Sequence, residues 1–346
     1  MSKGKQLLKR YFIDAMGAMA QGLFASLLIG TIIGTVGSQF GIDVMTKIAN
    51  YAKSTYVVGA AMAVAIGYAL KADPLVLFSL VTVGAAANDL GAAGGPLAVL
   101  VIAIIASECG SLVSKKTKVD ILVTPCVTIA VGVLLSILIA PPIGAAARAV
   151  GNLIMWATEL HPFFMGILVS LIIGIALTLP ISSAAICAAL KLTGLAGGAA
   201  VAGCCAQMVG FAVMSFRENR WSGLVSQGLG TSMLQMGNIV RNPRVWIPPT
   251  LASMITGPIA TCLFRLQMNG PEIASGMGTC GMVGPIGVYT GWVNDVASGA
   301  KTAITAMDWI GLVLICIVLP AVLSWFFGWI LRRIGWIKEG DLTLSV

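Results

Sequence analysis

The chain has 346 residues, of which 58% are hydrophobic and only 10% are charged, and its mean hydropathy is +0.96. A soluble domain carries about a quarter charged residues, so this composition excludes a soluble catalytic domain of any size and predicts a polytopic membrane protein. The formal net charge is +8. Because no segment offers a soluble basic face, we expect no nucleic-acid partner.

The basic residues flank apolar runs, as cytoplasmic loops do under the positive-inside rule. They form three clusters: Lys3, Lys5, Lys9 and Arg10; Lys115, Lys116 and Lys118; Arg332, Arg333 and Lys338. The sequence therefore predicts a multi-pass membrane protein with both termini on the cytoplasmic side. The first apolar run lacks a small-residue cleavage site, which favours a retained first span.

Apolar runs of membrane-spanning length recur along the chain. We expect an all-α fold of roughly eight to ten membrane segments, some of them re-entrant, within one integral membrane domain over residues 1–346. The clearest spans are Phe12–Val36, Ser54–Leu70, Val119–Ala140, Gly194–Phe216, Val245–Leu263 and Trp309–Ile330. Pro141 and Pro142 are expected to end the third of these, and Gly30 and Gly34 have the spacing of a helix-packing face.

The apolar run from Leu75 to Ala87 breaks at Asn88 and Asp89, before a glycine-rich stretch that ends at Pro96. The run is too short to cross a bilayer, so a half-helix that turns back at membrane depth fits it. Asn88 and Asp89 could then point polar groups into a cavity. An ordinary external loop with a glycine-rich turn fits equally well.

The only histidine, His161, lies two residues after Glu159 and directly before Pro162. Proline disfavours helical geometry at the preceding residue, so the pair is expected in non-helical backbone at the mouth of a helix. At membrane depth such a pair is costly unless it serves a function, which makes both residues candidate substrate ligands. A wetted interfacial pair without a function is an equal alternative.

Two glycine-rich segments share a Gly-x-Gly-Thr pattern, Gly228–Thr231 and Gly276–Thr279. Glycines allow the backbone to leave helical geometry, and paired Gly-interrupted segments indicate the binding site of a transporter. We expect the two segments to converge from opposite sides on one polar cavity that faces Glu159 or His161. The candidate substrate ligands along the chain are Asn88, Asp89, Glu159, His161, Ser182, Ser183, Thr231, Ser232, Asn238 and Thr279.

The eight cysteines lie inside or beside apolar stretches, without a CxxC pattern or a nearby histidine. They are typical of small packing residues in helices, so we expect no metal site and no cofactor.

Three stretches carry a family resemblance: the run Lys115–Pro125, the stretch His161–Ala185 and the block Gly228–Thr250. They resemble the enzyme IIC-like membrane proteins of the bacterial phosphotransferase system, in the branch that includes the perfringolysin O regulator. The resemblance implies a homodimeric channel or elevator-type carrier that moves a sugar or similar small polar solute by alternating access. It also implies separate IIA and IIB partner proteins, because the sequence shows no IIA or IIB domain.

Glucose-type relatives present a sugar-binding glutamate in a Gly-Ile-Thr-Glu motif, to which the nearest match here is Ala157–Leu160. The resemblance thus implies a sugar contact for Glu159. A membrane sensor that affects gene expression through a partner is the alternative function. Catalysis by the chain alone would rest only on Glu159 and His161, without a metal or an activated nucleophile beside them.

Overall fold

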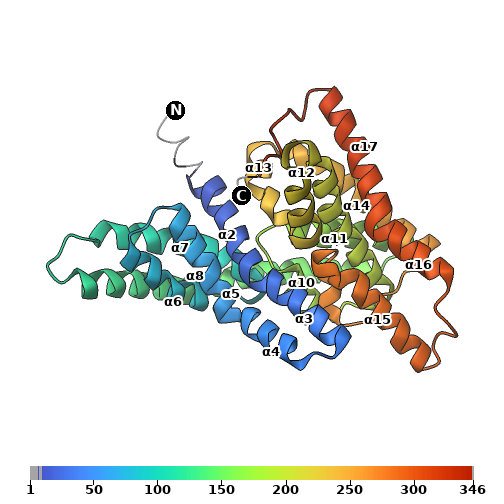
Figure 1. The fold of residues 1–346 in the computed structure, drawn as a ribbon, viewed down its shortest axis with the longest axis horizontal. Helices are drawn as coiled ribbons and strands as arrows, with labels where there is room; N and C mark the ends of the chain where they lie inside the picture. The colour runs from blue at the N-terminus through green and yellow to red at the C-terminus, as the bar shows by residue number, and fades with distance from the viewer. Residues whose placement is uncertain (1–6, 8–9, 345–346) are drawn as a thin grey trace. The chain divides into compact units, whose positions relative to one another are not determined.

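The computed structural model describes residues 7 and 10–344, and the regular elements in this part of the chain are helical (Figure 1). An isolated pairing between Gly194 and Met268 is the one β-bridge recorded for it. This confirms the predicted all-α polytopic membrane fold. The chain forms two compact units, one up to Ala147 and one from Arg148 to Leu344, and each is described by itself. That the whole chain acts as one functional domain stays a prediction.

The first unit begins with a continuous helical stretch of α- and π-helical turns and continues through helices separated by short turns. Its elements are η1 (Arg10–Asp14), α2 (Ala15–Leu23), η2 (Phe24–Leu28), α3 (Ile29–Phe40), α4 (Asp43–Ala52), α5 (Thr55–Ala69), α6 (Pro74–Gly91), η3 (Ala92–Gly94), α7 (Gly95–Val113) and the first part of α8 (Asp120–Thr158).

Small residues let the helices of the first unit approach each other closely. A Cβ atom at Gly59 of α5 would lie 2.2 Å from the carbonyl oxygen of Gly84 in α6, so the two backbones touch. Gly30 and Gly34 form the expected packing face, and they pack on Ala52 and Ala49 of the short amphipathic helix α4. The first unit is therefore a set of closely packed, mostly unbroken helices.

The predicted break after Ala87 falls later than the sequence indicates. Asn88 and Asp89 remain helical, so α6 has 18 residues and is about 27 Å long, enough to cross a bilayer. The chain reverses at Ala92, whose φ is +46°, and α7 packs back on α6. The segment is a helical hairpin with longer arms than the half-helix that we expected.

The prolines at 141 and 142 do not end a helix, which corrects the predicted boundary. α8 continues for 39 residues and contains Pro125, Pro141 and Pro142 inside it. A proline removes one backbone hydrogen bond and usually kinks a helix, but the neighbouring turns can continue it. The boundary between the two units lies in the same helix, directly after Ala147.

The second unit contains shorter and more broken elements. They are the end of α8, α9 (Pro162–Thr178), α10 (Ser183–Ala189), α11 (Gly194–Met214), α12 (Phe216–Val225), η4 (Ser226–Gly230), η5 (Ser232–Gln235), α13 (Met236–Arg241), η6 (Pro243–Trp246), α14 (Ile247–Pro258), η7 (Ile259–Leu263), η8 (Glu272–Gly276), η9 (Cys280–Met282), α15 (Val283–Ala297), α16 (Ala306–Val313), η10 (Leu314–Val318) and α17 (Leu319–Arg333).

Helix α11 is the centre of the second unit (Figure 1). Most of its residues are buried, and α9, α14 and α17 pack around it. Its first residue, Gly194, pairs with Met268, and the carbonyl oxygen of its last residue, Met214, accepts a hydrogen bond from Arg332 at the end of α17. These contacts define two opposite ends of the unit, the Gly194 end and the Met214 end.

The described residues include five helical stretches long and apolar enough to cross a membrane: Arg10–Phe40, Pro74–Val113, Asp120–Thr158, Gly194–Met214 and Ala306–Arg333. The second of these is the α6–α7 hairpin. Two shorter apolar helices, Thr55–Ala69 and Pro162–Thr178, accompany them. The multi-pass prediction is confirmed at this level.

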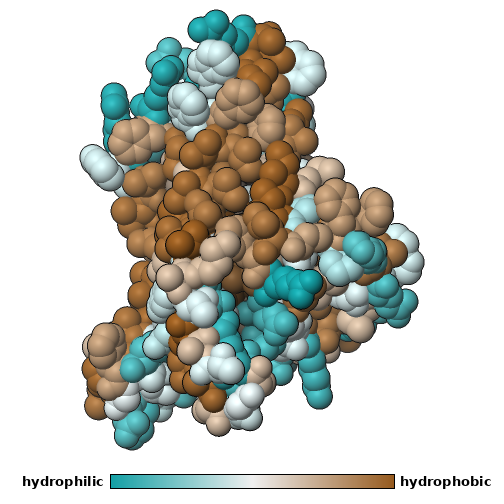
Figure 2. Space-filling model, turned by 90° about the vertical axis from the view of Figure 1, so that its right-hand side faces the viewer, coloured by the Kyte–Doolittle hydropathy of each residue, from teal (hydrophilic) through white to brown (hydrophobic). Residues whose placement is uncertain are grey.

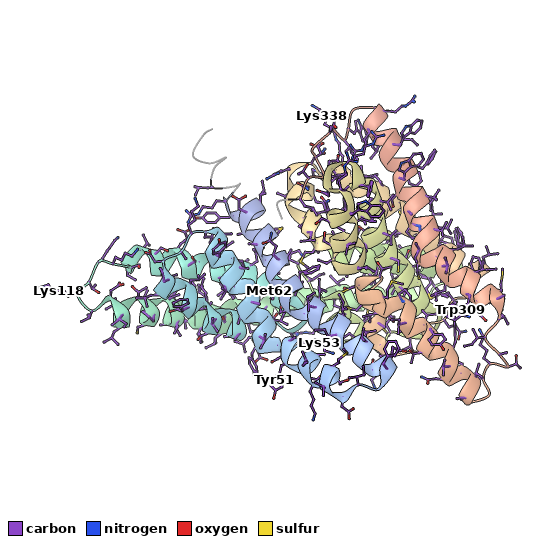
Figure 3. All side chains as sticks on the ribbon, viewed as in Figure 1. Tyr51, Lys53, Met62, Lys118, Trp309 and Lys338 are labelled. Atoms are coloured by element: carbon purple, nitrogen blue, oxygen red, sulfur yellow. The ribbon has the colours of Figure 1, made fainter. Side chains whose placement is uncertain are left out.

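The last apolar stretch carries large hydrophobic side chains on its surface. On the face shown in Figure 2, apolar residues gather into a broad area with hydrophilic residues towards its ends, as expected where a protein meets lipid. Trp309 and Lys338 lie at opposite ends of this α16–α17 stretch (Figure 3). The exposed residues along it include Trp309, Ile310, Val313, Ile317, Val318, Val322, Trp325, Phe326 and Trp329.

Candidate functional site

The glycines of α11 bring neighbouring backbones into contact with the middle of this helix. A Cβ atom at Gly203 would lie 2.0 Å from the carbonyl oxygen of Ser170 in α9, and one at Gly198 would lie 1.8 Å from that of Leu266. Only a residue without a side chain permits such approaches. As a result, the single amide side chain of this helix, Gln207, is enclosed by protein on all sides.

Gln207 is the centre of a buried hydrogen-bond network. Its Oε1 accepts a 2.9 Å bond from the indole Nε1 of Trp246 and a 3.3 Å bond from Thr178 Oγ1. Its Nε2 lies 3.3 Å from Thr250 Oγ1 and 3.4 Å from Ser253 Oγ. Four elements therefore meet at one amide group, and each partner is polar without being charged.

Thr178 connects this network to the first Gly-x-Gly-Thr segment. Its hydroxyl lies 2.8 Å from Ser232 Oγ, and Ser232 is fully buried. Thr178 is the last residue of α9, directly before the chain breaks at Pro180. The hydroxyl at the end of α9 thus pairs with the hydroxyl directly after the Gly228–Thr231 segment, next to Gln207.

The Gly228–Thr231 segment reaches this centre from the Met214 end of the second unit. It follows α12, which begins directly beyond Met214, and its backbone leaves α-helical geometry at η4 and becomes extended at Thr231. After Ser232 the chain returns through η5 and α13. This segment forms a re-entrant hairpin, which we call the inner hairpin (residues 216–241).

The Gly276–Thr279 segment reaches the same region from the Gly194 end. It follows Met268, which pairs with Gly194, and Gly278 adopts a left-handed φ of +52° where it packs on Cys204 and Cys205 in the middle of α11. The chain then returns through α15. We call this segment the outer hairpin (residues 268–297).

The tips of the two hairpins meet, because η4 of the inner hairpin contacts η9 of the outer hairpin. A third break joins them, since Ser183 Oγ donates a 2.7 Å hydrogen bond to the carbonyl oxygen of Gly276. Ser182 caps α10 beside it by accepting a bond from the backbone N–H of Ala185. The second unit therefore brings together Ser182, Ser183, Thr231, Ser232 and Thr279 of the predicted ligands.

Thr279 differs from its neighbours in having a polar atom without a partner. Its Oγ1 is buried, and no hydrogen bond to it is present. An unsatisfied buried hydroxyl is uncommon and is normally explained by a water molecule or a bound group. Among the hydroxyls of Ser182, Ser183, Thr231, Ser232 and Thr279, that of Thr279 is the one without a partner in the structure.

Glu159 and His161 lie elsewhere. Both are exposed beyond the first residue of α9, at the end of that helix opposite Thr178. With 17 residues, α9 separates them from Thr178 by about 25 Å. His161 caps α9, with its Nδ1 3.5 Å from the backbone nitrogen of Phe163. The backbone at His161 is non-helical as predicted, but the structure does not bring this pair to the hairpin tips.

The remaining predicted ligands are also separate from the tips. In the first unit, Asn88 is buried and its Nδ2 donates a 2.8 Å bond to the carbonyl oxygen of Thr55, whereas Asp89 is exposed. Asn238 lies on the returning arm of the inner hairpin and donates to Gln235 and to the carbonyl oxygen of Thr343.

Sequence reasoning missed the centre itself, which comprises Thr178, Gln207, Trp246, Thr250 and Ser253. One signal could have found it: Gln207 is the only amide in a 21-residue run of glycine, alanine and other apolar residues. A buried amide in a membrane helix needs partners from neighbouring helices.

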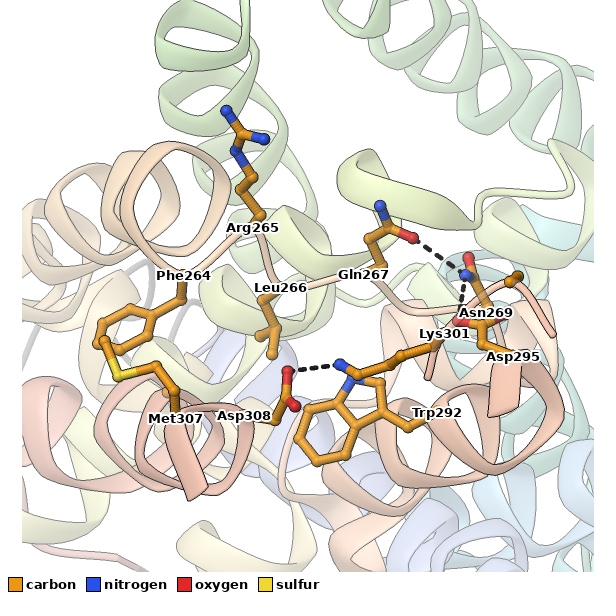
Figure 4. Close-up of a pocket in the computed structure, with 12 residues that line it drawn as sticks. Phe264, Arg265, Leu266, Gln267, Asn269, Trp292, Asp295, Lys301, Met307 and Asp308 are labelled. Atoms are coloured by element: carbon orange, nitrogen blue, oxygen red, sulfur yellow. Dashed lines mark hydrogen bonds and ion pairs between the residues drawn. The ribbon is translucent and has the colours of Figure 1, made fainter. Parts of the chain in front are cut away.

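A polar cavity of about 250 Å³ lies at the Gly194 end of the second unit (Figure 4). On one side, Lys301 Nζ bonds Asp308 Oδ1 at 2.6 Å above the ring of Trp292. On the other side, Asn269 Nδ2 bonds Asp295 Oδ2 at 2.9 Å and Gln267 Oε1 at 3.1 Å. The cavity is open to solvent, and its polar lining consists of two amide, two acidic and two basic side chains.

Apolar helices that surround broken segments, whose tips meet at a buried polar centre, are the features of a membrane solute carrier. The comparisons with known proteins agree. The family model described as "Phosphotransferase system, EIIC" matches residues 13–344, so the chain belongs to this family. It is thus the membrane-embedded permease component of a sugar phosphotransferase system. Neither a curated protein nor a solved structure matches the chain.

Membership in this family supports a sugar substrate and separate IIA and IIB partners. No group of three or more histidine, cysteine, aspartate or glutamate side chains is placed to hold a metal ion within residues 10–344.

Proposed function

We propose that the second unit carries the sugar and that the polar centre around Gln207 is where the sugar is bound. The observation that carries this proposal is the meeting of three chain breaks at one buried set of uncharged hydrogen-bonding groups. Hydroxyl and amide groups can both donate and accept, which suits the hydroxyls of a neutral sugar. Thr279 Oγ1, which has no partner, is available for the first such bond.

The orientation of the second unit in the membrane follows from the distribution of its basic residues. The Met214 end of the second unit carries most of its basic residues: Arg217, Arg220, Arg241, Arg244, Arg332, Arg333 and Lys338. Under the positive-inside rule this end faces the cytoplasm, and the Gly194 end with its polar cavity faces outward. The sugar would enter past the outer cavity, bind between the hairpin tips and leave beside the inner hairpin to a IIB partner.

Alternating access would result from movement of the second unit relative to the first. The two compact units join inside α8, next to Pro141 and Pro142, which supports a hinge at this place. Glu159 and His161, exposed at the outer end of α9, would act at the entrance of the path. We also propose Asn88 and Asp89 of the first unit as sugar ligands. The protein is further proposed to act as a homodimer.

Uptake into proteoliposomes over a panel of sugars, with and without a candidate IIB protein, tests the proposal. We expect Gln207→Leu to abolish uptake of the transported sugar and Glu159→Gln to reduce it less. Thr128→Val is a matched control, because Thr128 is equally buried but bonds only to its own helix. The absence of uptake of every sugar in the wild-type protein, or equal loss in all three variants, would overturn the proposal.

A further inference from the structure

The segment after α17 folds back onto the inner hairpin. The chain turns at Gly335, whose φ is +77°, a conformation that favours glycine. Ile337 and Leu342 are then 2% and 0% exposed, although residues 338–340 between them are exposed. A short segment with two apolar anchors thus lies in a groove of the second unit. We call residues 337–344 the tail.

Side-chain amides of the inner hairpin bind the backbone of the tail. Asn219 makes a paired contact, because its Nδ2 donates to the carbonyl oxygen of Leu342 at 2.8 Å and its Oδ1 accepts from the backbone nitrogen of Leu344 at 2.9 Å. Gln235 Nε2 donates to the same Leu342 oxygen at 3.1 Å, and Asn238 Nδ2 donates to that of Thr343 at 3.0 Å.

A fourth amide holds the beginning of the tail. Asn242 Nδ2 lies 2.9 Å from the carbonyl oxygen of Trp336 and 2.9 Å from Asp341 Oδ2. Asp341 Oδ2 also accepts from the backbone nitrogen of Lys338 at 2.8 Å. Three amide side chains of the inner hairpin, and Asn242 directly after it, therefore recognise peptide groups, with Leu342 as the buried side-chain anchor.

These contacts differ from ordinary helix packing. Gln235 is 0% and Asn238 is 5% exposed, so without the tail their amide groups would lose partners inside the protein. Amides that donate to peptide carbonyls and accept from peptide nitrogens recognise a backbone of almost any sequence, here one that forms turns at residues 339–342, whereas the buried position of Leu342 selects an apolar residue. The groove has the chemistry of a peptide-binding site.

A short chain of hydrogen bonds runs from the groove into the inner hairpin, and the backbone of this hairpin leads on to the sugar centre. Gln235 Nε2 also donates to Gln227 Oε1 at 2.8 Å, and Gln227 Nε2 donates to Ser215 Oγ at 2.8 Å. Gln235 thus ties the two arms of the inner hairpin together while it holds the tail. It lies three residues after Ser232, which bonds Thr178 in the centre.

We propose that this amide-lined groove is a binding site for a short peptide segment in a turn conformation, filled in the structure by the chain's own tail, and that its occupancy holds the inner hairpin in place. Release of the tail loosens the hairpin and opens the path from the sugar centre towards the cytoplasm. The second statement rests on the proposed function, whereas the first does not.

Peptide binding to the full-length chain tests the first statement. The variant Leu342→Asp removes the buried anchor and vacates the groove. A fluorescent peptide with the sequence of residues 337–344 should bind this variant at least tenfold more tightly than the wild-type chain, whose groove is filled. The same peptide carrying aspartate in place of Leu342 should bind neither. Equal binding of both peptides, or no binding of the native peptide to a folded variant, would overturn the proposal.

Hydrogen exchange provides a measurement that does not depend on Leu342. In full-length Asn219→Ala, the backbone N–H of Leu344 loses its acceptor, and we expect exchange at least tenfold faster at residues 342–344 and 226–235. Glu339→Ala is the matched control, because Glu339 is an exposed part of the tail with no hydrogen bond or ion pair in the structure. Unchanged exchange in Asn219→Ala, or equal changes in both variants, would contradict the proposal.

Sugar flux tests the coupling. We expect Leu342→Asp to raise passive sugar flux through proteoliposomes severalfold in the absence of a IIB protein, and the native peptide in excess to reverse this rise. Peptide binding without any sugar flux in the wild-type protein would overturn the proposed function and leave the groove intact. Normal sugar flux without peptide binding would overturn the groove and leave the proposed function intact.

Discussion

The two units differ in how they satisfy their buried hydroxyl groups. In the first unit, Ser26, Ser79, Thr128 and Ser136 each donate to the carbonyl oxygen four residues earlier in the same helix. In the second unit, the hydroxyl of Thr256 also bonds within its own helix, but other hydroxyls bond across elements. Ser170 donates to the carbonyl oxygen of Ser253, Ser183 to that of Gly276, and Thr178 pairs with Ser232.

The difference follows from the continuity of the helices. An unbroken helix offers each serine or threonine a carbonyl oxygen of its own preceding turn, so burial in an apolar bundle needs no partner from elsewhere. A broken helix exposes backbone groups and places hydroxyls near other segments. Long-range hydroxyl bonds therefore mark the unit with chain breaks, and they support the proposal that the solute path lies in the second unit.

The largest effect is expected where two backbones touch. Gly203→Val would place a side chain 2.0 Å from the carbonyl oxygen of Ser170, so α9 and α11 must separate and the centre loses its geometry. We expect destabilisation of about 2 kcal/mol or more, measured as thermal unfolding in detergent, with loss of uptake. Gly17→Ala is the control, because a Cβ atom there meets nothing within 4 Å. Similar unfolding temperatures for the two variants would contradict this account.

The second-largest effect is expected at the buried polar centre of the second unit. Gln207→Leu removes the amide at the centre of the hydrogen-bond network and leaves the indole N–H of Trp246 without an acceptor. This lowers the free energy of unfolding by about 1–3 kcal/mol. We expect sugar affinity, measured by binding of labelled sugar, to fall at least tenfold. Ser136→Ala in the first unit should leave affinity unchanged, because its hydroxyl bonds only within α8. The comparison between the units fails if Ser136→Ala has the larger effect.

Loss of one long-range hydroxyl group should matter less. Thr178→Val removes the pairing with Ser232 and the longer bond to Gln207 Oε1, and a loss of about 1 kcal/mol from the shorter bond corresponds to roughly fivefold in sugar affinity. Thr128→Val is the counterpart with a local bond, and its affinity should match the wild type. The measurement is a sugar-binding curve for each variant. Identical curves for Thr178→Val and Thr128→Val would show that Thr178 is not part of the sugar site.

The smallest effect concerns an exposed charge of the first unit. The hydrogen bond from the Lys115 ammonium lowers the pKa of Asp73 below its ordinary value of 3.8. A carboxyl whose folded pKa is depressed stabilises the protein above its unfolded pKa, and the stabilisation is lost as pH falls through the folded value. Asp73→Asn should therefore lower the unfolding temperature slightly at pH 7, and this difference should shrink as the pH falls below 3.8. A difference that grows with acidity would contradict the assignment.

The sequence alone determined much of the fold. Apolar run lengths located α5, α11 and the α16–α17 stretch within a few residues, because a bilayer demands a fixed length of apolar helix. Pro162 correctly predicted the non-helical backbone at His161. The glycines of the two Gly-x-Gly-Thr segments correctly predicted breaks, and the segments meet from opposite ends of α11.

The tertiary structure decided which polar residues share a place. Glu159 and His161 precede the apolar helix α9, but only the packing of α9 on α11 shows that the buried polar centre forms at the other end of this helix, at Thr178. In the sequence, Pro141 and Pro142 predict the end of a helix, whereas in the structure α8 continues through them. Local chemistry predicts where a helix can break and which groups need partners. The partners of Gln207 come from segments up to 46 residues away, so only the folded chain could reveal them.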